Sequence, residues 1–92
     1  MISVLLPAYN EEEFIAEAVQ SILDQSHIDF ELIIINDGST DNTPKILESF
    51  NDNRIIIINN EKNYGLSKSL NIGVAKVAPT IYRIVREIML VW

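Results

Sequence analysis

The sequence predicts a three-layer α/β/α fold built on a mainly parallel sheet, and two kinds of pattern carry this prediction. Short apolar runs rich in β-branched residues occur at residues 2–6, 30–35 and 54–58, and such runs are typical of buried strands. The segments between and after them place apolar residues at helical spacing. Strands that alternate with helices indicate a parallel sheet with right-handed crossovers.

The first predicted helix follows the first strand almost directly. Asn10 and Glu13 have the spacing of a capping box, with Asn in the position usual for Ser or Thr. The apolar positions behind them form one helical stripe, made of Phe14, Ile15, Ala18, Val19, Ile22 and Leu23. We expect this helix to end near Ser26 and His27.

Two further helices complete the alternation. Thr43-Pro44 has the pattern of a cap followed by the first helical residue, and it opens a short helix that buries Ile46, Leu47 and Phe50. A polar loop over residues 59–65 then leads into a third helix from Leu66 to about Val77.

The tail from residue 79 onward has a different pattern from the rest. Its apolar positions follow helical spacing, which favours a helix over a strand, and Thr80 after Pro79 is a suitable cap. These positions are Ile81, Ile84, Val85, Ile88, Met89 and Trp92. We therefore divide the chain into a domain of residues 1–78 and a divergent, helical C-terminal tail of residues 79–92.

Length and charge limit the possible functions. Ninety-two residues suffice for one small domain with a single core, and a hydrophobic fraction of 48% fits a folded chain. A net charge of −6 argues against a nucleic-acid partner, which requires a basic stripe. The absence of cysteine excludes a disulfide framework and is compatible with a reducing cytoplasm.

No segment has the pattern of a membrane span or a signal peptide, because the first apolar run is too short and no basic stretch precedes it. We expect no membrane insertion. We expect the chain in the cytoplasm, either free or at the cytoplasmic face of the membrane.

Three sequence blocks resemble family 2 glycosyltransferases, which are nucleotide-sugar-dependent enzymes of the GT-A fold. The blocks are Val4 to Glu12, Asn36 to Asp41 and Asn63 to Gly73, and they occur in the family's order and spacing. The resemblance covers roughly residues 1–78. It implies a truncated GT-A domain that contains the half that binds the donor nucleotide.

The resemblance also implies which residues bind the nucleotide. Pro7, Ala8 and Tyr9 match the block that lines the base and ribose, and Tyr9 has an aromatic face on which a base can stack. Glu11 matches an acid that reaches the ribose hydroxyls, and Asp37 matches the aspartate that accepts a hydrogen bond from the base.

Three more candidates come from the second and third blocks. Gly38 and Ser39 follow Asp37 in the second block. Lys68, near the start of the third helix, is a candidate for the diphosphate, since a helix N-terminus and a lysine both favour anions. The full set of nucleotide-binding candidates is Pro7, Ala8, Tyr9, Glu11, Asp37, Gly38, Ser39 and Lys68.

Structural roles remain open for several of these residues. Asp37 can start an Asx-turn before Gly38, and Tyr9 can pack between helix and sheet. Glu11 suits a helix N-terminus through the macrodipole, and Lys68 can be a solvated helix lysine. The family commonly carries arginine where this chain has Leu70.

The metal-binding part of the family pattern is missing. The family's Asp-x-Asp motif holds Mg²⁺ or Mn²⁺ against the donor diphosphate, but the last aspartate here is Asp52. A later general base is also absent. We therefore expect no metal ligand and no catalytic residue in this chain, and no turnover by the chain alone, whereas a complete member would use Mg²⁺ or Mn²⁺.

Two functions stay open. The first is glycosyl transfer from a UDP-, GDP- or dTDP-sugar to an acceptor, as in polysaccharide biosynthesis, with this chain as the donor-binding half. The second is a non-catalytic interaction module that forms a homo-oligomer through the tail or a sheet edge. A dinucleotide-binding domain is disfavoured because no Gly-x-Gly-x-x-Gly follows the first strand.

Overall fold

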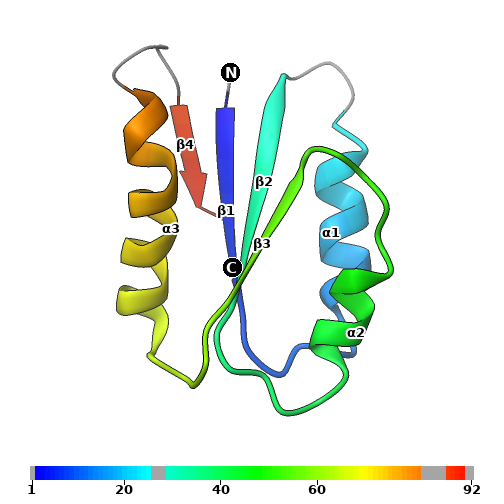
Figure 1. Ribbon diagram of the computed structural model, residues 1–92. Helices are drawn as coiled ribbons and strands as arrows, with labels where there is room; N and C mark the ends of the chain where they lie inside the picture. The colour runs from blue at the N-terminus through cyan, green and yellow to red at the C-terminus, as the bar shows by residue number, and fades with distance from the viewer. Residues whose placement is uncertain (1, 26–28, 82–86, 91–92) are drawn as a thin grey trace.

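The computed structural model describes residues 2–25, 29–81 and 87–90. Within these ranges strands and helices alternate along the chain (Figure 1). The elements are β1 (Ile2–Ala8), α1 (Ile15–Leu23), β2 (Phe30–Asn36), α2 (Thr43–Glu48), β3 (Ile55–Asn59), α3 (Leu66–Ile81) and β4 (Glu87–Leu90).

The described strands form one parallel sheet in the order β3-β2-β1-β4. Its register aligns Ala8 of β1 with Asn36 of β2, and Asn36 with Asn59 of β3. The carboxyl ends of these strands therefore lie in one row. The polar segments that follow them all start at the same edge of the sheet.

Helices cover both faces of this sheet, which confirms the predicted three-layer fold. In Figure 1, α3 lies on one side, and α1 and α2 lie on the other. Alternate side chains of each strand point to opposite faces, so the apolar residues divide into two cores. The core under α1 and α2 contains Val4, Leu6, Ala8, Ile15, Val19, Leu23, Phe30, Leu32, Ile34 and Leu47. The core on the α3 side contains Leu5, Ile33 and Ile35, flanked by Ile56 and Ile58.

Glycine lets α3 approach the sheet closely. A Cβ at Gly73 would lie 3.0 Å from Cδ1 of Ile35 and 3.4 Å from Cδ2 of Leu5. The helix backbone thus rests on the two strand residues that form the centre of this core. A larger side chain at Gly73 would push α3 away from β1 and β2.

The structure confirms the predicted strands and moves the helix ends. β2 extends through Asn36, one residue beyond the predicted run. Thr43 is the first residue of α2 rather than its cap, and Asn42 occupies the cap position. α3 continues to Ile81, past the domain boundary expected at residue 78.

The predicted capping box of Asn10 and Glu13 is wrong. α1 begins at Ile15, its cap is Phe14, and no side chain caps it. Asn10 has a positive φ of 51°, and its Oδ1 accepts a hydrogen bond from the backbone N–H of Thr40 at 2.8 Å. Asn10 therefore links two loops, and its side chain is not available to the helix.

The prediction of a helical tail is also wrong over residues 87–90, which form β4. This strand pairs in parallel with β1, with Ile2 aligned to Glu87 and Leu5 to Leu90. The outer edge of β1 carries backbone groups that need hydrogen-bond partners, and pairing at that edge outweighs the helical spacing of a short apolar run. The tail positions 82–86 and 91–92, like Ser26 and His27, lie outside the described residues.

Within the described ranges, every helix falls short of the length or the apolarity that crossing a bilayer requires.

Arg54 joins three elements at the amino end of β3. Its guanidinium donates to Asp52 Oδ2 at 2.8 Å and to the carbonyl oxygen of Leu23, the last residue of α1, at 3.2 Å. Its Cζ also lies 4.8 Å from the ring centre of Phe30, the first residue of β2. The hydrogen bonds from the Arg54 side chain and backbone lower the pKa of Asp52 to about 2.

We predict that Asp52→Asn makes the free energy of unfolding less sensitive to acid. The Asp52 carboxyl has a lower pKa in the folded chain than in the unfolded chain, so it contributes stability above pH ~4 that is lost as the pH falls toward 2. The variant should be less stable than the wild type at pH 7 and lose less stability between pH 4 and pH 2. Urea unfolding at a series of pH values measures both effects.

Glu48→Gln controls for the change in net charge, because it removes an acid from an exposed position on α2. Parallel pH curves for Asp52→Asn and the wild type would contradict the prediction.

Candidate functional site

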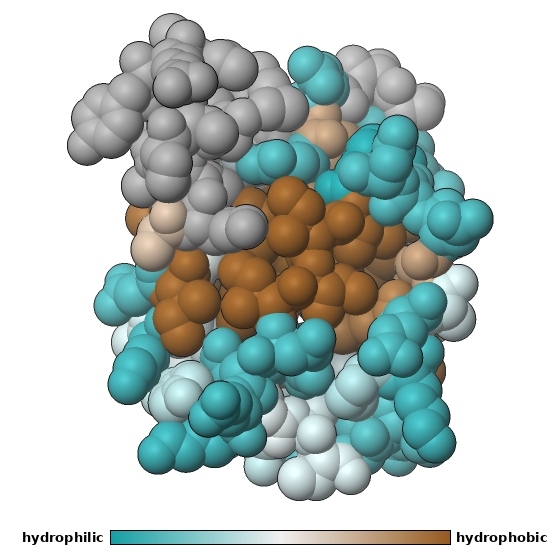
Figure 2. All heavy atoms as spheres, viewed as in Figure 1, coloured by the Kyte–Doolittle hydropathy of each residue, from teal (hydrophilic) through white to brown (hydrophobic). Residues whose placement is uncertain are grey.

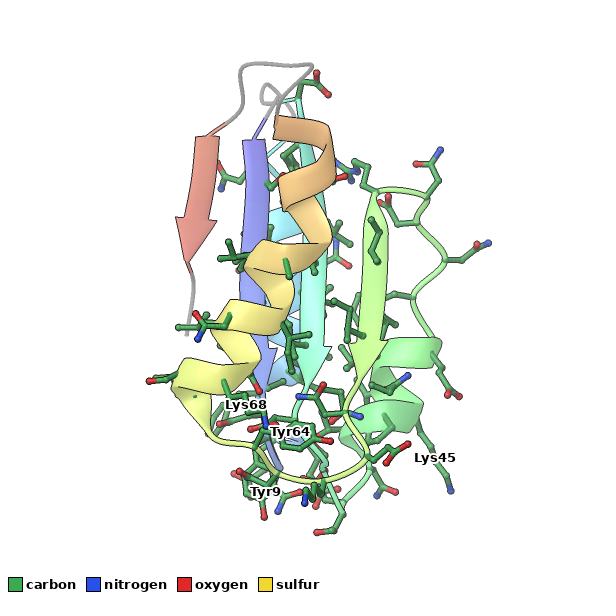
Figure 3. All side chains as sticks on the ribbon, turned by 60° about the vertical axis from the view of Figure 1, so that its left-hand side comes forward. Tyr9, Lys45, Tyr64 and Lys68 are labelled. Atoms are coloured by element: carbon green, nitrogen blue, oxygen red, sulfur yellow. The ribbon has the colours of Figure 1, made fainter. Side chains whose placement is uncertain are left out.

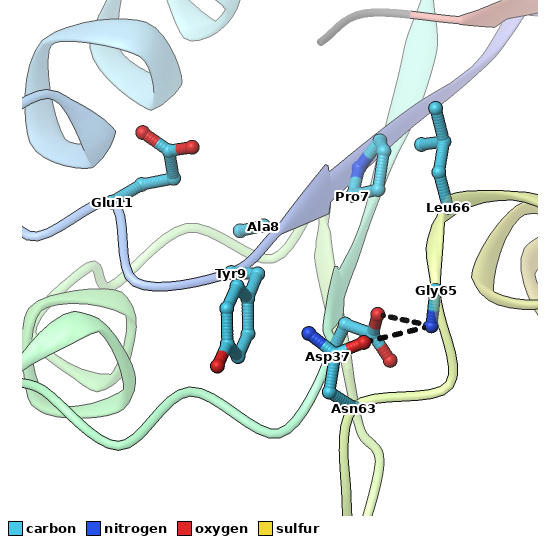
Figure 4. A pocket seen from close by; sticks show the side chains of 8 residues that line it. All are labelled: Pro7, Ala8, Tyr9, Glu11, Asp37, Asn63, Gly65 and Leu66. Atoms are coloured by element: carbon cyan, nitrogen blue, oxygen red, sulfur yellow. Dashed lines mark hydrogen bonds between the residues drawn. The ribbon is translucent and has the colours of Figure 1, made fainter.

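A pocket of about 260 Å³ opens at the carboxyl edge of the sheet. Figure 4 shows the residues that line it: Pro7, Ala8, Tyr9, Glu11, Asp37, Asn63, Gly65 and Leu66. They come from three segments, namely the end of β1 with its following loop, the residue after β2, and the loop that leads into α3. The pocket therefore exists because parallel strands end in one row.

The carboxylate of Asp37 lies at the base of this pocket and is almost fully buried, with 4% of the residue exposed. Oδ1 accepts hydrogen bonds from the backbone N–H of Tyr64 at 2.8 Å and from Nδ2 of Asn60 at 3.0 Å. Oδ2 accepts one from the backbone N–H of Gly65 at 3.0 Å. These donors all come from the segment after β3, so Asp37 does not form the alternative Asx-turn.

Hydrogen bonding keeps this buried carboxylate ionised. Burial by itself raises the pKa of Asp37, because it penalises the charged form. The hydrogen bonds from the Tyr64 N–H, from Asn60 and Ser69, and from the Gly65 N–H more than offset burial, so the pKa lies below its ordinary value. Asp37 is therefore a fixed negative charge at neutral pH.

Gly38 allows the loop after β3 to lie directly on the end of β2. Its φ is +73°, and a Cβ built on it would come within 2.4 Å of the carbonyl carbon of Lys62 and 2.5 Å of the nitrogen of Asn63. Backbone atoms cannot move aside as the tip of a side chain can. A residue without a side chain is thus required for this packing.

Backbone N–H groups of the β1–α1 loop donate hydrogen bonds to side chains in the β2–α2 loop and at the start of α2. The backbone N–H of Asn10 donates to Oγ of Ser39 at 3.0 Å, and the N–H of Glu11 donates to Oγ1 of Thr43 at 2.9 Å. The N–H of Glu12 also donates to Asp41 Oδ2, at 3.3 Å. These bonds fix the β1–α1 loop against the β2–α2 loop.

The structure brings five of the eight predicted site residues together. Pro7, Ala8, Tyr9, Glu11 and Asp37 all line the pocket. Tyr9 is 43% exposed, so it does not pack between helix and sheet as the alternative held. The Glu11 side chain lies across Ala8 and Tyr9 from Asp37 (Figure 4), and no hydrogen bond to its carboxylate is found in the described part of the chain.

The other three predicted residues do not line the pocket. Gly38 and Ser39 shape the loops around it, as described above. Lys68 lies next to Tyr64, with its Nζ 4.5 Å from the ring centre, and Nζ of Lys62 lies 5.7 Å from the same ring. Figure 3 shows Lys68, Tyr64 and Tyr9 together at this end of the molecule, with Lys45 further away.

Sequence reasoning missed the wall formed by Asn63, Gly65 and Leu66. The third block contains all three residues, but the block gives no sign that it folds back to Asp37. Sequence reasoning also missed Asn60, whose side chain contacts both Asp37 and Ser69. Gly65 has a positive φ of +91°, a backbone conformation that glycine favours. This glycine is the one local sign of the turn in the sequence.

A second pocket of about 210 Å³ adjoins the first and shares Pro7 and Glu11 with it. The rest of its lining is apolar: Leu6, Phe14, Ile15 and Ala18. Among the described residues, no three His, Cys, Asp or Glu side chains gather in a way that could hold a metal ion.

We predict that Gly38→Ala destabilises the fold more than Gly65→Ala. Both glycines have positive φ, which costs another residue roughly 1–2 kcal/mol. Only at Gly38 does a Cβ meet backbone, whereas nothing lies within 4 Å of a Cβ at Gly65. Overpacking at Gly38 should add about 1–3 kcal/mol. Urea unfolding of both variants measures the difference, and equal losses of stability would refute the proposed contact with the loop.

Comparison with known proteins places this chain in a family. The model of glycosyl transferase family 2 matches residues 3–82. An uncharacterized glycosyltransferase from Haemophilus influenzae is 48% identical over 75 residues, which cover 79% of this chain and 23% of that protein. The chain thus spans about a quarter of the length of this relative.

Solved structures agree with the sequence match. S. aureus TarS in complex with UDP-GlcNAc superposes with a TM-score of 0.75 at 32% identity, over 82% of this chain and 23% of that chain. The mannosyltransferase PcManGT from Pyrobaculum calidifontis, in complex with GDP-Man and Mn²⁺, gives 0.74 at 25% identity, over 82% and 24%. The chain therefore belongs to glycosyl transferase family 2 and has the fold of the corresponding part of these enzymes.

Proposed function

We propose that this chain is the donor-nucleotide-binding part of a glycosyltransferase that transfers a sugar from a nucleotide-diphosphate donor to an acceptor. The observation that carries the proposal is the pocket at the carboxyl edge of the sheet, where the exposed ring of Tyr9 lies beside the buried, ionised Asp37. Two structural neighbours support it, since one is in complex with UDP-GlcNAc and the other with GDP-Man and Mn²⁺.

The lining of the pocket suits a nucleoside. Tyr9 offers a flat face on which a base can stack, and Pro7, Ala8 and Leu66 supply apolar walls. Glu11 has a carboxylate without a protein partner among the described residues, and it can accept hydrogen bonds from ribose hydroxyls. A volume of about 260 Å³ lies just below the range of pockets that enclose a drug-sized ligand, so it suits the base and ribose rather than a whole nucleotide sugar.

The diphosphate requires positive charge, and we assign it to Lys68 with Lys62. Both ammonium groups lie against the ring of Tyr64, which belongs to the loop that forms the far wall of the pocket. Gly38 and Ser39 complete the proposed set through the loops that they shape rather than through contact with the pocket.

A divalent cation does not fit the residues at hand. Of the two carboxylates in the pocket, Asp37 is occupied by protein donors, which leaves Glu11 as a single available acid. One carboxylate is not a ligand set for Mg²⁺ or Mn²⁺. We propose that the chain by itself binds the donor without transferring the sugar. A cytoplasmic location fits a chain without cysteine and is part of the proposal.

A second candidate function, an interaction module, has one observation in its favour. β3 forms one end of the described sheet, and its isoleucines, Ile55 to Ile58, are only half-buried. Figure 2 shows apolar surface gathered in the middle of the view, where Figure 1 draws β3. An unpaired apolar edge strand favours association with another chain, including a second copy of this one. Nucleotide binding separates the two functions.

We predict saturable binding of UDP, GDP or dTDP to this chain, measured by calorimetric titration with and without Mn²⁺. Tyr9→Ala should weaken the binding about tenfold, because stacking on an aromatic ring contributes ~1–3 kcal/mol per base. Phe14→Ala is the matched control, since it removes an aromatic ring that is 61% exposed and outside the first pocket.

A folded chain that binds none of these nucleotides would overturn the proposed function and favour the interaction module. Equal losses for Tyr9→Ala and Phe14→Ala would overturn the role of Tyr9 alone.

A further inference from the structure

We infer that Tyr64 is a positioning residue, whose ring holds the ammonium groups of Lys62 and Lys68 in place for the diphosphate of the nucleotide. Through this ring the pocket distinguishes a nucleoside diphosphate from the bare nucleoside. The inference rests on the proposed function and deepens it, because it names the residue that places the two cations and the part of the ligand that they contact.

Two lysines share the ring of Tyr64. Nζ of Lys68 lies 4.5 Å from the ring centre, and Nζ of Lys62 lies 5.7 Å from it. Both distances fall within the range, about 6 Å, in which the negative face of an aromatic ring attracts a cation. Lys62 belongs to the loop before α3 and Lys68 to the first turn of that helix. The ring is therefore the element that brings the two charges together.

No neighbouring acid neutralises these ammonium groups. In the part of the chain that the structure describes, the one ion pair joins Arg54 to Asp52, at the opposite end of β3. The two lysine Nζ atoms lie no farther apart than the sum of their distances to the ring, which is comparable to the Debye length in 0.1 M salt, about 10 Å. The two charges thus repel each other, and an anionic ligand between them relieves this repulsion.

Each ammonium group keeps donors for a ligand while it lies on the ring. An ammonium group has three N–H donors, and contact with a ring face leaves part of them free to point elsewhere. Among the described residues, neither Lys62 nor Lys68 donates a hydrogen bond to a protein acceptor. Phosphate oxygens accept hydrogen bonds from ammonium groups, so the ring and a diphosphate can hold the same lysine at once.

The backbone fixes Tyr64 beside the pocket. Its N–H donates to Oδ1 of Asp37 at 2.8 Å, and Asn63 and Gly65 on either side of it line the pocket. Figure 3 shows the rings of Tyr64 and Tyr9 together at this end of the molecule. The ring of Tyr64 thus holds its two cations next to the wall of the pocket in which we place the nucleoside.

The ring of Tyr64 can influence binding in three ways, which its removal separates. If it positions the lysines, its loss weakens the binding of diphosphates and leaves nucleosides unaffected. If the lysines must leave the ring to reach the phosphates, its loss strengthens the binding of diphosphates. If the ring contacts the base, its loss weakens diphosphates and nucleosides by the same factor.

The experiment titrates this chain with UDP, GDP and dTDP, each beside its nucleoside, by calorimetry and, for weak binding, by NMR. In Tyr64→Leu the diphosphates should bind about tenfold more weakly, because the ligand must then order two lysine side chains. The nucleosides should bind as they do to the wild type. Tyr64→Phe keeps an aromatic face for the lysines and should restore the wild-type affinity.

Variants of the lysines test the same contact separately. Lys62→Gln and Lys68→Gln should each weaken the diphosphates about tenfold, a loss typical of a hydrogen bond between charged groups, and leave the nucleosides unchanged. In the Tyr64→Leu background each change should cost less, since the ring no longer holds the lysines. Lys45→Gln is the matched control, because Lys45 is exposed on α2 and lies further from the ring (Figure 3). It should bind as the wild type does.

Proton NMR without ligand gives a second readout at the ring itself. Protons above an aromatic ring resonate upfield, so the ε-protons of Lys68 should be shifted upfield in the wild type and in Tyr64→Phe. In Tyr64→Leu they should resonate as those of the exposed Lys45 do. Circular dichroism shows whether each variant folds, and the lysine variants keep the test valid if Tyr64→Leu does not.

Several results would overturn the inference while the proposed function stands. They are equal losses for diphosphate and nucleoside in Tyr64→Leu, unchanged or tighter binding of the diphosphates in that variant, and equal affinity of the wild type for diphosphate and nucleoside. A wild type that binds none of these ligands overturns the proposed function and the binding role of Tyr64 with it. In that case an upfield shift at Lys68 would identify the contact with the ring as a structural one.

Discussion

A buried negative charge at the end of β2 governs how the carboxyl edge of this sheet is built. Asp37 is shielded from water, so its charge is tolerated only where donors surround it. Its hydrogen-bond donors are Asn60, Tyr64 and Gly65, which lie more than twenty residues later in the chain. The need to satisfy one carboxylate thus determines where the loop before α3 runs. Because that loop carries Asn63 and Gly65, the same need forms the pocket.

The polar residues around Asp37 illustrate how one sequence motif can serve loop structure as well as a pocket. Ser39 and Asp41 accept hydrogen bonds from the backbone of the β1–α1 loop, and Oδ1 of Asn10 accepts one from the backbone N–H of Thr40. The two loops meet because β1 and β2 end in register. Their unpaired backbone groups then require partners, and short side chains with oxygen atoms provide them. A polar residue at a strand end can therefore hold two loops together by hydrogen bonds, and its presence alone does not identify a ligand contact.

Local sequence patterns predict much of the fold but only part of the candidate site. Runs of β-branched residues predicted β2 and β3 to within one residue, because a buried strand needs nothing beyond its own apolar side chains. The tail was mispredicted because the edge of β1, which pairs with residues 87–90, is distant in sequence. Pro7, Ala8 and Tyr9, at the carboxyl end of β1, could be predicted because they match the first family block.

Asn60 could not be predicted in the same way. Its role depends on contacts with residues 23 positions earlier and 9 later, which no local pattern contains.

The charge balance of the chain makes the surroundings of Tyr64 important for an anionic ligand. A net charge of −6 repels a nucleoside diphosphate unless positive groups near the pocket are free to meet it. In the described ranges the one ion pair joins Arg54 to Asp52, at the opposite end of β3, and there the carboxylate neutralises the guanidinium. Lys62 and Lys68 instead lie against an aromatic ring. A ring face orients an ammonium group without cancelling its charge. Tyr64, whose backbone N–H is held by Asp37, thereby links the anchored loop to two available cations beside the pocket.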